Sequence, residues 1–450
     1  MSEIIVSKYG GKTLTTKEGV EKVKEITYDD DRRKIVVVSA IGQENGFEDR
    51  TTQLLVKLSQ TKDRKLIDRI KDKYSKVYPN QTTEIINLEK ELARRVDEKG
   101  NLSDGAYEDR LKAFGEEANA KFMAAKFGWE YIDPKEIFLV TNDFGNAKIL
   151  PESQKMITDR LKDAKKPVVV PGFFGYTRDN QIATFDYGGG DITGAVISEA
   201  LEALVYENYT NENGIFSANP DMIKPKKPAK IEEITFSEMR DLSYSGFGVF
   251  HPEAIAPVKR AGIPVHLRNP KDYPKVGTYI VTERISNPEK PIIGIAYKEG
   301  FCSFDIDSDG LNEEIGIGAE ILNLFARKKI PYEFFPGSID DVSVILKQNY
   351  FPKTNDIGKT INGLKKIVGN NSSVEFRENL GVIAIAGKGL KNRVGISAEV
   401  ENVLAGSGVN IAFKVQGVKE RCMIYGINSK DGKTSMNALL DKYDYLLDNS

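Results

Sequence analysis

The sequence predicts an α/β protein in which a mostly parallel sheet flanked by helices is followed by two small α+β modules. Short β-branched runs alternate with longer helical patterns through residues 1–283, and such alternation is typical of a parallel sheet covered by helices on both faces. Residues 283–291 are rich in Ser, Asn, Pro and Lys, which indicates a linker. An internal repeat follows it and indicates two similar modules.

Four apolar runs are the predicted strands of the sheet. Runs this short and this continuously apolar are typical of parallel strands buried on both faces. Between Asp49 and Lys126 the pattern is helical and highly charged, and we interpret those charges as a solvated helix surface. The predicted strands are Ile4–Val6, Ile35–Val38, Ile137–Val140 and Val168–Val170.

The repeat is clearest where Ala319–Ala326 lies 79 positions before Ala398–Ala405. Each copy has apolar residues at helical spacing and then a short strand-like run. We therefore expect a first domain at 1–283 and two modules at 292–365 and 375–450. Tandem modules of this size are hard to explain as catalytic machinery, so we interpret them as ligand-sensing units.

Composition excludes several functional classes. The chain has 450 residues, too many for one ordinary core, and its formal net charge of −2 gives no electrostatic basis for binding nucleic acid or an anionic membrane. No apolar run approaches the roughly 20 residues of a membrane span, and no signal-peptide pattern is present, so we expect a cytoplasmic protein. Cys302 and Cys422 are expected to be reduced thiols. His251 and His266 are interpreted as structural, because neither has the spacing of a metal ligand.

A glycine turn directly after the first predicted strand, Lys8–Thr13, is the first candidate site. Gly10 and Gly11 leave backbone N–H groups free to approach phosphate oxygens. The segment also imitates the end of a P-loop, but the first P-loop glycine would fall on Val6, so that interpretation fails. By itself the glycine pair is equally consistent with an ordinary tight turn.

Two further segments also fit either a ligand-binding or an ordinary structural interpretation. Tyr187–Asp191 contains three consecutive glycines before a predicted helix, which fits an anion cradle or a flexible loop, and Asp191 fits a helix N-cap. Gly115 and Glu116 open an Ala-rich helix. There the carboxylate of Glu116 fits an ammonium-binding group or a surface residue in the first helical turn.

Taken together and in chain order, these and other segments resemble the motifs of the aspartokinase family. The resemblance covers the whole chain and is closest to the monofunctional, lysine-regulated type. It implies an amino-acid-kinase-type fold followed by two ferredoxin-like ACT modules. The matching segments are Lys8–Gly11, Val37–Ala40, Ala113–Glu116, Thr184–Asp191, Gly214–Pro220, Phe250–Pro252, Ala261–Val265, Arg268–Asn269 and Gly277–Thr278.

The resemblance implies transfer of the γ-phosphoryl group of MgATP to the side-chain carboxylate of L-aspartate, the first step towards lysine, threonine and methionine. A carboxylate with a pKa of about 4 is already ionised at neutral pH. Such a site therefore needs no general base and has only to position two anions and neutralise their charge. ATP and Mg²⁺ are the implied cofactors. The Mg²⁺ would arrive with ATP and keep mostly water and phosphate ligands, so no dedicated protein metal site is expected.

The resemblance also assigns roles to individual residues. Lys8 and Asp191 are the implied catalytic pair, with Asp191 assisting substrate or Mg²⁺. Lys8, Gly10 and Gly11 would serve the transferred phosphoryl group. The implied acceptor-binding residues are Ser39, Thr52, Glu116, Tyr187 and Lys12, and the implied nucleotide-binding residues are Thr210, Asn211, Phe216 and Asp221.

Several positions depart from the family pattern. Tyr187 replaces an arginine that clasps the substrate carboxylate, and a phenol donates one neutral hydrogen bond where a guanidinium donates two charge-assisted ones. Lys12 replaces a threonine, and we hypothesise that its ammonium takes over part of that anion binding; the alternative is that it points to solvent. The other departures are Gly190 for serine, Asn211 for aspartate, Gly248 for lysine and Asp221 for arginine.

The modules match the effector pocket of lysine-sensitive relatives at Leu311, Gly316, Glu333 and Ser338. Glu333 keeps the charge that an effector ammonium needs, although it also fits an exposed residue after a strand. Three functions stay open: a lysine-regulated aspartate kinase, a kinase for a different carboxylic or amino acid, and a catalytically weak paralogue that binds amino acids. A homodimer or a dimer of dimers is expected, because ACT pairs typically associate side by side.

Overall fold

The computed structural model describes residues 3–43, 49–186, 188–244, 255–369 and 372–448. The chain divides into two compact units. The first comprises residues 1–215, 232–236 and 249–284, and the second comprises residues 216–231, 237–248 and 285–450. The chain therefore enters the second unit twice before it settles there after residue 284.

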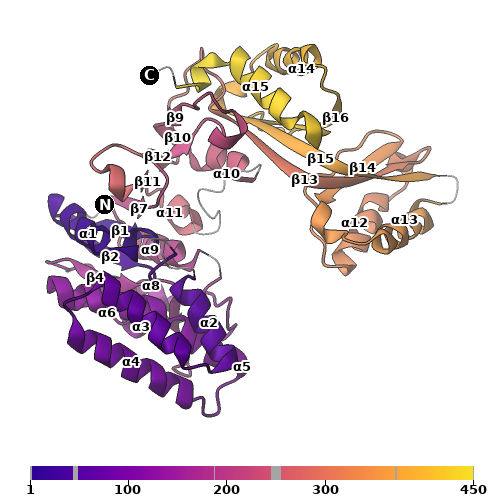
Figure 1. Ribbon diagram of the computed structural model, residues 1–450. Helices are drawn as coiled ribbons and strands as arrows, with labels where there is room; N and C mark the ends of the chain where they lie inside the picture. Colours follow the sequence, from indigo (N-terminus) through magenta and orange to yellow (C-terminus); the bar gives the residue numbers. More distant parts are fainter. Residues whose placement is uncertain (1–2, 44–48, 187, 245–254, 370–371, 449–450) are drawn as a thin grey trace. The chain divides into compact units, whose positions relative to one another are not determined.

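The first unit is built on an eight-stranded sheet in the order β10-β12-β11-β7-β1-β2-β4-β3 (Figure 1). All its neighbouring strands are parallel except β11 and β12, which confirms the mostly parallel sheet. The strands are β1 (Ile5–Tyr9), β2 (Arg33–Val38), β3 (Glu130–Tyr131), β4 (Val168–Pro171), β7 (Val205–Tyr209), β10 (Glu233–Thr235), β11 (Val265–Arg268) and β12 (Thr278–Val281).

Helix α1 buries one apolar stripe, whereas α6 is buried along nearly all of its first three turns. In α1, Val20, Val23 and Ile26 recur at helical spacing and are fully buried, and Thr16 caps the helix by accepting from the Gly19 N–H at 3.0 Å. The charged region between Asp49 and Lys126 forms the predicted helices. The helices are α1 (Lys17–Asp29), α2 (Thr51–Thr61), α3 (Lys65–Val77), α4 (Thr82–Asp97), α5 (Asp104–Lys112), α6 (Phe114–Phe127), α8 (Glu152–Leu161), α9 (Gly189–Ala200) and α11 (Ala256–Ala261).

The predicted strand Ile137–Val140 is wrong. Asp133 and Glu136 form a capping box around Pro134, and this starts the short helix α7 (Pro134–Ile137). Leu139 and Val140 make only isolated bridges. The apolar run is buried, but the local start signal for a helix decides its conformation. Within the described residues, two short strand pairs lie outside the main sheet: β5 (Phe174–Tyr176) with β6 (Ile182–Thr184), and β8 (Ile215–Phe216) with β9 (Lys230–Ile231).

A buried ion network joins the central strands. Glu207 on β7 accepts from Arg33 Nε of β2 at 2.7 Å and from Arg268 Nη1 of β11 at 3.2 Å. Ser7 Oγ of β1 donates to the same carboxylate at 3.1 Å. The two guanidinium groups hold the pKa of Glu207 below its ordinary value despite burial. Side chains of four neighbouring strands, β11, β7, β1 and β2, are thus tied together.

The second unit contains an antiparallel five-stranded sheet in the order β14-β13-β15-β17-β16. It confirms the α+β class predicted for the C-terminal part. The strands are β13 (Gly294–Asp307), β14 (Asp341–Lys347), β15 (Ser373–Ala386), β16 (Ile411–Gln416) and β17 (Cys422–Asn428), and the helices are α10 (Phe236–Tyr244, in this unit from Ser237), α12 (Ile317–Arg327), α13 (Thr354–Val368), α14 (Ile396–Gly406) and α15 (Gly432–Lys442).

The predicted repeat is confirmed by α12 and α14, which have equal length and each follow a glycine with φ of 87°. Two hydrophobic cores correspond to the two copies. One joins α12 and α13 to the C-terminal half of β13, and the other joins α14 and α15 to the N-terminal half of β13. Strand β13 therefore serves both cores, and the limits 292–365 and 375–450 stay predictions.

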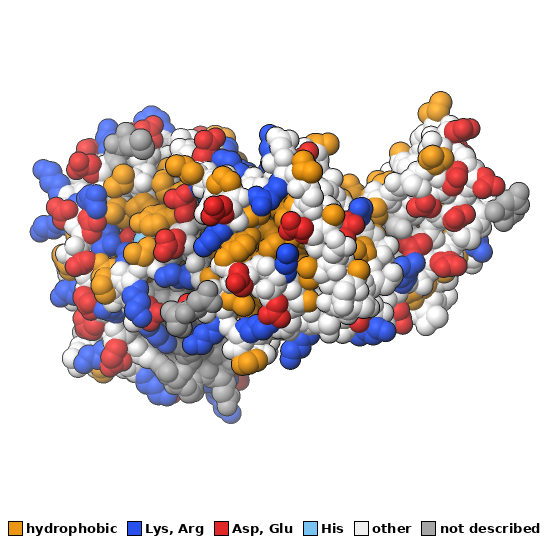
Figure 2. Space-filling model, turned by 90° about the horizontal axis from the view of Figure 1, so that it is seen from above, with side chains coloured by type: hydrophobic (Ala, Val, Ile, Leu, Met, Phe, Trp, Pro, Cys, Tyr) orange, Lys and Arg blue, Asp and Glu red, His pale blue; other side chains and the backbone are white. Residues whose placement is uncertain are grey.

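The charged surface, the two cysteines and the buried histidine agree with what the sequence predicts. On the face in Figure 2, positive and negative side chains are interspersed among apolar ones. Cys302 and Cys422 are free thiols, as predicted. His266 is buried and stacks on Tyr279, and burial lowers its pKa to about 4, which fits a structural role. In the described part of the chain no helix is long and apolar enough to cross a bilayer.

Candidate active site

The turns at the carboxyl ends of β1, β2 and β7, together with the start of α9, line one cavity of about 460 Å³. In open α/β sheets such strand ends are the usual place for a ligand site. Most of the predicted site residues meet here. The cavity is lined by Lys8, Gly10, Gly11, Lys12, Ser39, Thr52, Glu116, Gly190, Asp191, Thr210 and Asn211, among others.

Lys8 and Asp191 form an ion pair inside the cavity, with 2.6 Å between Nζ and Oδ1. Asn208 Nδ2 donates to the same carboxylate oxygen at 2.7 Å. Asn208 was not predicted, but it is the direct partner of Lys8 in the parallel register of β1 and β7, so both side chains lie on one face. Asp191 is not the N-cap of α9, because Gly188 holds that position with φ of 85°. Its carboxylate instead lines the cavity, where it pairs with Lys8 and Asn208.

Two glycine turns fit against each other at the floor of the cavity. Gly42 N–H donates to the Gly11 carbonyl at 2.9 Å. A Cβ on Gly11 would lie 2.6 Å from the Ala40 carbonyl oxygen, and one on Gly42 would lie 2.7 Å from the Gly11 carbonyl carbon. Neither position can therefore carry a side chain without moving the backbone. The turn after β1 continues into a short 3₁₀ helix, so α1 begins only at Lys17.

Glu116 lies in the first turn of α6 and is 6% exposed, so the surface interpretation is wrong. Burial raises the pKa of this carboxyl group to about 7, against the opposing effect of the Ala40 N–H. Its Oε2 atom has no hydrogen-bond partner within the described residues. A buried carboxylate oxygen of this kind is costly unless a ligand pairs with it. An ammonium group would restore the ordinary pKa.

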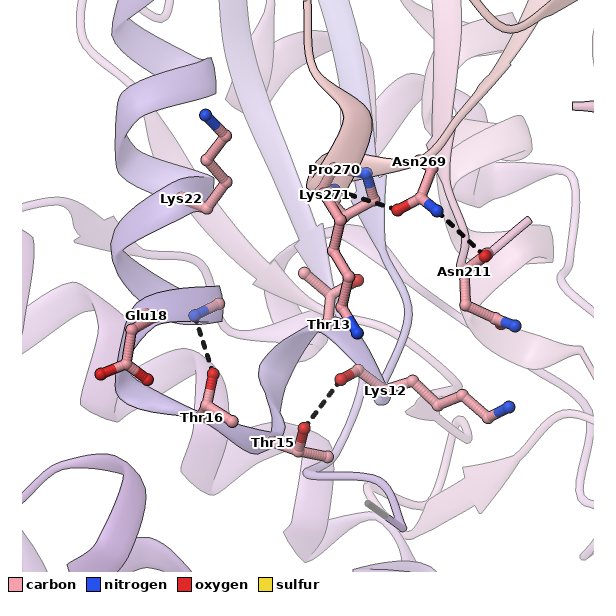
Figure 3. A pocket seen from close by; sticks show the side chains of 11 residues that line it. Lys12, Thr13, Thr15, Thr16, Glu18, Lys22, Asn211, Asn269, Pro270 and Lys271 are labelled. Carbon is pink, nitrogen blue, oxygen red and sulfur yellow. Dashed lines mark hydrogen bonds between the residues drawn. The ribbon is translucent and has the colours of Figure 1, made fainter. Parts of the chain in front are cut away.

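A second cavity of about 320 Å³ opens beside the first and shares Lys12 and Asn211 with it. Figure 3 shows the Lys12 side chain extending away from Thr16 and Glu18. Thr15 Oγ1 donates to the Lys12 carbonyl at 2.9 Å, and Asn269 Nδ2 donates to the Asn211 carbonyl at 3.0 Å. Lys12 therefore borders both cavities.

The remaining predicted site residues lie elsewhere. Phe216 and Asp221 belong to the second unit. Tyr187, Gly248 and His251 lie outside the described residues. Nothing in the part of the chain that the structure describes groups three or more His, Cys, Asp or Glu residues in a metal-binding arrangement.

The predicted effector residues gather around the start of α12 and the edge strand β14. Glu333 has a side chain only 6% exposed and lies 3.6 Å from Lys347 Nζ, so the interpretation as an exposed residue is wrong. Ser338 N–H donates to the Asp341 carbonyl at 2.8 Å. Leu311 is buried in a short 3₁₀ turn, and Gly316 precedes α12 with a left-handed backbone.

The fold and the site define a member of the amino acid kinase family, whose model matches residues 3–269. An ACT domain model matches residues 383–443. More narrowly, the chain belongs to the aspartokinase family. Aspartokinase 3 of Bacillus subtilis is 34% identical, with 97% of this chain and 98% of that protein covered.

Two further relatives extend over the full length. Lysine-sensitive aspartokinase 3 of Escherichia coli is 25% identical over 98% of this chain and 99% of its own. The crystal structure of Clostridium acetobutylicum aspartate kinase matches with a TM-score of 0.85 and 28% identity, over 97% of this chain and 99% of that one. The chain is thus a kinase with an ACT-containing C-terminal part, as the motifs predicted.

Proposed function

We propose that the protein transfers the γ-phosphoryl group of MgATP to the side-chain carboxylate of L-aspartate and releases 4-phospho-L-aspartate and ADP. The observation that carries this proposal is the convergence of Lys8, Asp191 and the buried Glu116 on one cavity. The acceptor carboxylate is ionised at neutral pH. The site therefore needs cations and N–H donors, which the cavity has, and it needs no general base.

The residues fit a nucleotide and its cation. Gly10 and Gly11 present backbone without side chains beside the Lys8 ammonium, an arrangement suited to phosphate oxygens. The carboxylate of Asp191 is a hard oxygen ligand of the kind Mg²⁺ prefers. Mg²⁺, when bound, would offset charge on the phosphates. We assign the nucleotide to Thr210 and Asn211, which line the cavity. The nucleotide roles of Phe216 and Asp221 stay predictions from the sequence.

We assign the acceptor to the other half of the cavity. Glu116 takes the α-ammonium group, because its buried carboxylate lacks a cationic partner at hydrogen-bond distance in the described structure. Ser39 and Thr52 line the same half and donate hydroxyl hydrogen bonds. Lys12 stands in for part of the missing arginine as a point charge.

The decisive experiment is ADP release from MgATP with a panel of amino acids at saturating ATP. Aspartate should give the highest kcat/KM, and hydroxylamine should trap the acyl phosphate as a hydroxamate. Rapid turnover with glutamate or another acid and none with aspartate would show that the acceptor is that acid and not aspartate. No turnover with any of them would favour the catalytically weak paralogue.

A different acceptor has one structural observation in its favour. At Gly190, where the family has serine, a Cβ would lie 3.2 Å from Ser39 Oγ and 3.5 Å from Lys8 Cε. Glycine therefore leaves room next to the acceptor residues. A Gly190→Ser variant that loses activity towards a larger acid and gains it towards aspartate would establish this second candidate.

We further propose that lysine inhibits the enzyme through the C-terminal modules, in line with the similarity to the lysine-sensitive aspartokinase 3 of Escherichia coli. The effector would lie at Leu311, Gly316, Glu333 and Ser338, with Glu333 binding its ammonium group. The proposed domains are 1–283, 292–365 and 375–450. A cytoplasmic homodimer or dimer of dimers at the head of lysine, threonine and methionine synthesis fits this function, and light scattering with and without lysine tests the assembly.

A further inference from the structure

Helix α3 carries a buried lysine that none of the roles above uses. Lys73 is 3% exposed. Its Nζ donates to the Gly42 carbonyl at 3.0 Å and makes a second, short hydrogen bond to the Asp49 carbonyl. A lysine is almost never buried to this extent unless its ammonium group is paired or hydrogen-bonded. Here the ammonium binds the backbone carbonyl of Gly42, in the turn after β2, and that of Asp49, which comes shortly before α2.

The contact leads directly to the active site. Gly42 receives the Lys73 hydrogen bond at its carbonyl and gives its own N–H to the Gly11 carbonyl at 2.9 Å. Gly11 and Gly42 both line the large cavity. Two hydrogen bonds therefore connect the Lys73 ammonium to the backbone of the phosphoryl-side turn.

Neighbouring residues of the same helix support the acceptor half of the cavity. Tyr74 Oη donates to the Gly115 carbonyl at 2.7 Å, next to Glu116. Tyr78, which ends α3, donates to Asn119 Oδ1 at 2.6 Å, and Asn119 Nδ2 donates to the Ser39 carbonyl at 2.7 Å. Polar groups of α3 and its C-cap residue thus contact the backbone at Gly42 and Gly115 directly, and at Ser39 through Asn119.

We propose that Lys73 is a positioning residue for acceptor binding: its ammonium fixes the Gly42 carbonyl and thereby holds the turn after β2 against Gly11. Lys73 touches neither substrate nor nucleotide. Small displacements of aligned groups have large effects on phosphoryl transfer, because catalysis depends mainly on positioning. The inference rests on the proposed function for its kinetic test.

Lys73→Met removes the donors and keeps most of the stem. It is expected to raise the KM for the amino acid by about tenfold and to leave the KM for ATP within about twofold, since orientation of the acceptor is what changes. Lys73→Arg keeps a cation with several N–H donors and should retain a KM near the wild-type value. The matched control is Lys71→Met on the same helix, where the ammonium pairs with Glu89 at the surface.

A purely structural role would lower the amount of folded enzyme, and hence kcat, with KM unchanged, and that result would overturn the proposal. So would a Lys73→Arg variant as impaired as Lys73→Met. Amide hydrogen exchange of residues 36–43 needs no substrate, and the Gly42 amide should exchange at least about tenfold faster in Lys73→Met only, because its hydrogen bond to Gly11 weakens. If the wild-type protein accepts no amino acid, the proposed function fails while this exchange result still decides the role of Lys73.

Discussion

The strongest prediction concerns the effect of Glu116 on how the stability of the fold depends on pH. Burial raises its pKa from 4.5 to about 7 in the folded chain, so the folded state binds the proton more tightly than the unfolded state. The stability this provides is fully present below pH 4.5 and is lost as the pH rises to about 7. From the size of the shift, the loss amounts to roughly 3 kcal/mol.

Glu116→Gln tests this directly, because glutamine resembles the protonated acid in shape and cannot ionise. Urea unfolding at intervals between pH 4 and pH 8.5 should give equal stabilities for the two proteins at the acid end. At pH 8 the variant should be more stable by up to about 3 kcal/mol. Parallel stability profiles for wild type and variant over this range would refute the assignment of a raised pKa to Glu116.

The same ionisation should govern acceptor binding. Only the ionised carboxylate pairs with an ammonium group, so the KM of the wild-type enzyme for aspartate should fall as the pH rises from 6 to 8. Below the pKa it should change by about tenfold per pH unit. In Glu116→Gln the KM should be high at every pH in this window, while the KM for ATP stays close to wild type. A pH-independent KM in the wild type would remove Glu116 from acceptor binding.

Three further predictions follow from the same structure. Lys8→Ala should lower kcat by about 10²-fold or more with a small change in the KM for ATP, because the charge of Lys8 matters most where charge develops in the transition state. Steady-state ADP release measures this, and near-normal turnover would exclude Lys8 from the catalytic step. Lys12→Thr should nearly abolish activity, and combining it with Tyr187→Arg should restore much of that activity. A double-mutant cycle quantifies this coupling. A Lys12→Thr variant with unchanged activity would refute the hypothesis that Lys12 takes over part of the anion binding. Lysine at a hundredfold excess over its Kd should stabilise the fold by about 2.7 kcal/mol, and Glu333→Ala should abolish the shift in melting temperature. An unmoved melting curve for the wild type would count against an effector site.

Much of the fold was predictable because buried parallel strands leave continuous apolar runs in the sequence. The run at Ile137–Val140 misled us, since Asp133 and Pro134 give a helix-start signal that outweighs local β-propensity. The continuity of β13 was equally hidden. Gly300 has φ of 91° and the register with β15 shifts beside it, so the sequence pattern breaks where the strand bends and continues.

The site was predictable where residues lie in recognisable segments, with Lys8 near the end of a strand and Glu116 and Asp191 in the first turn of a helix. Asn208 was missed because an asparagine inside a strand has no motif, and only the register with Lys8 shows its position. Lys73 was missed for another reason. In a charged amphipathic helix a lysine suggests a solvated face, and nothing local distinguishes the one whose ammonium binds inward to Gly42.

The sharing of β13 between two cores has a consequence for how the C-terminal part can come apart. Strands β13 and β15 have 14 residues each and remain paired along almost their whole length. A chain truncated after α13 would lose β15, which would leave the N-terminal half of β13 without a strand partner and its C-terminal half paired with β14 alone. Neither module can therefore be excised as an independent piece, and calorimetry should record one melting transition for the pair where two autonomous domains would give two.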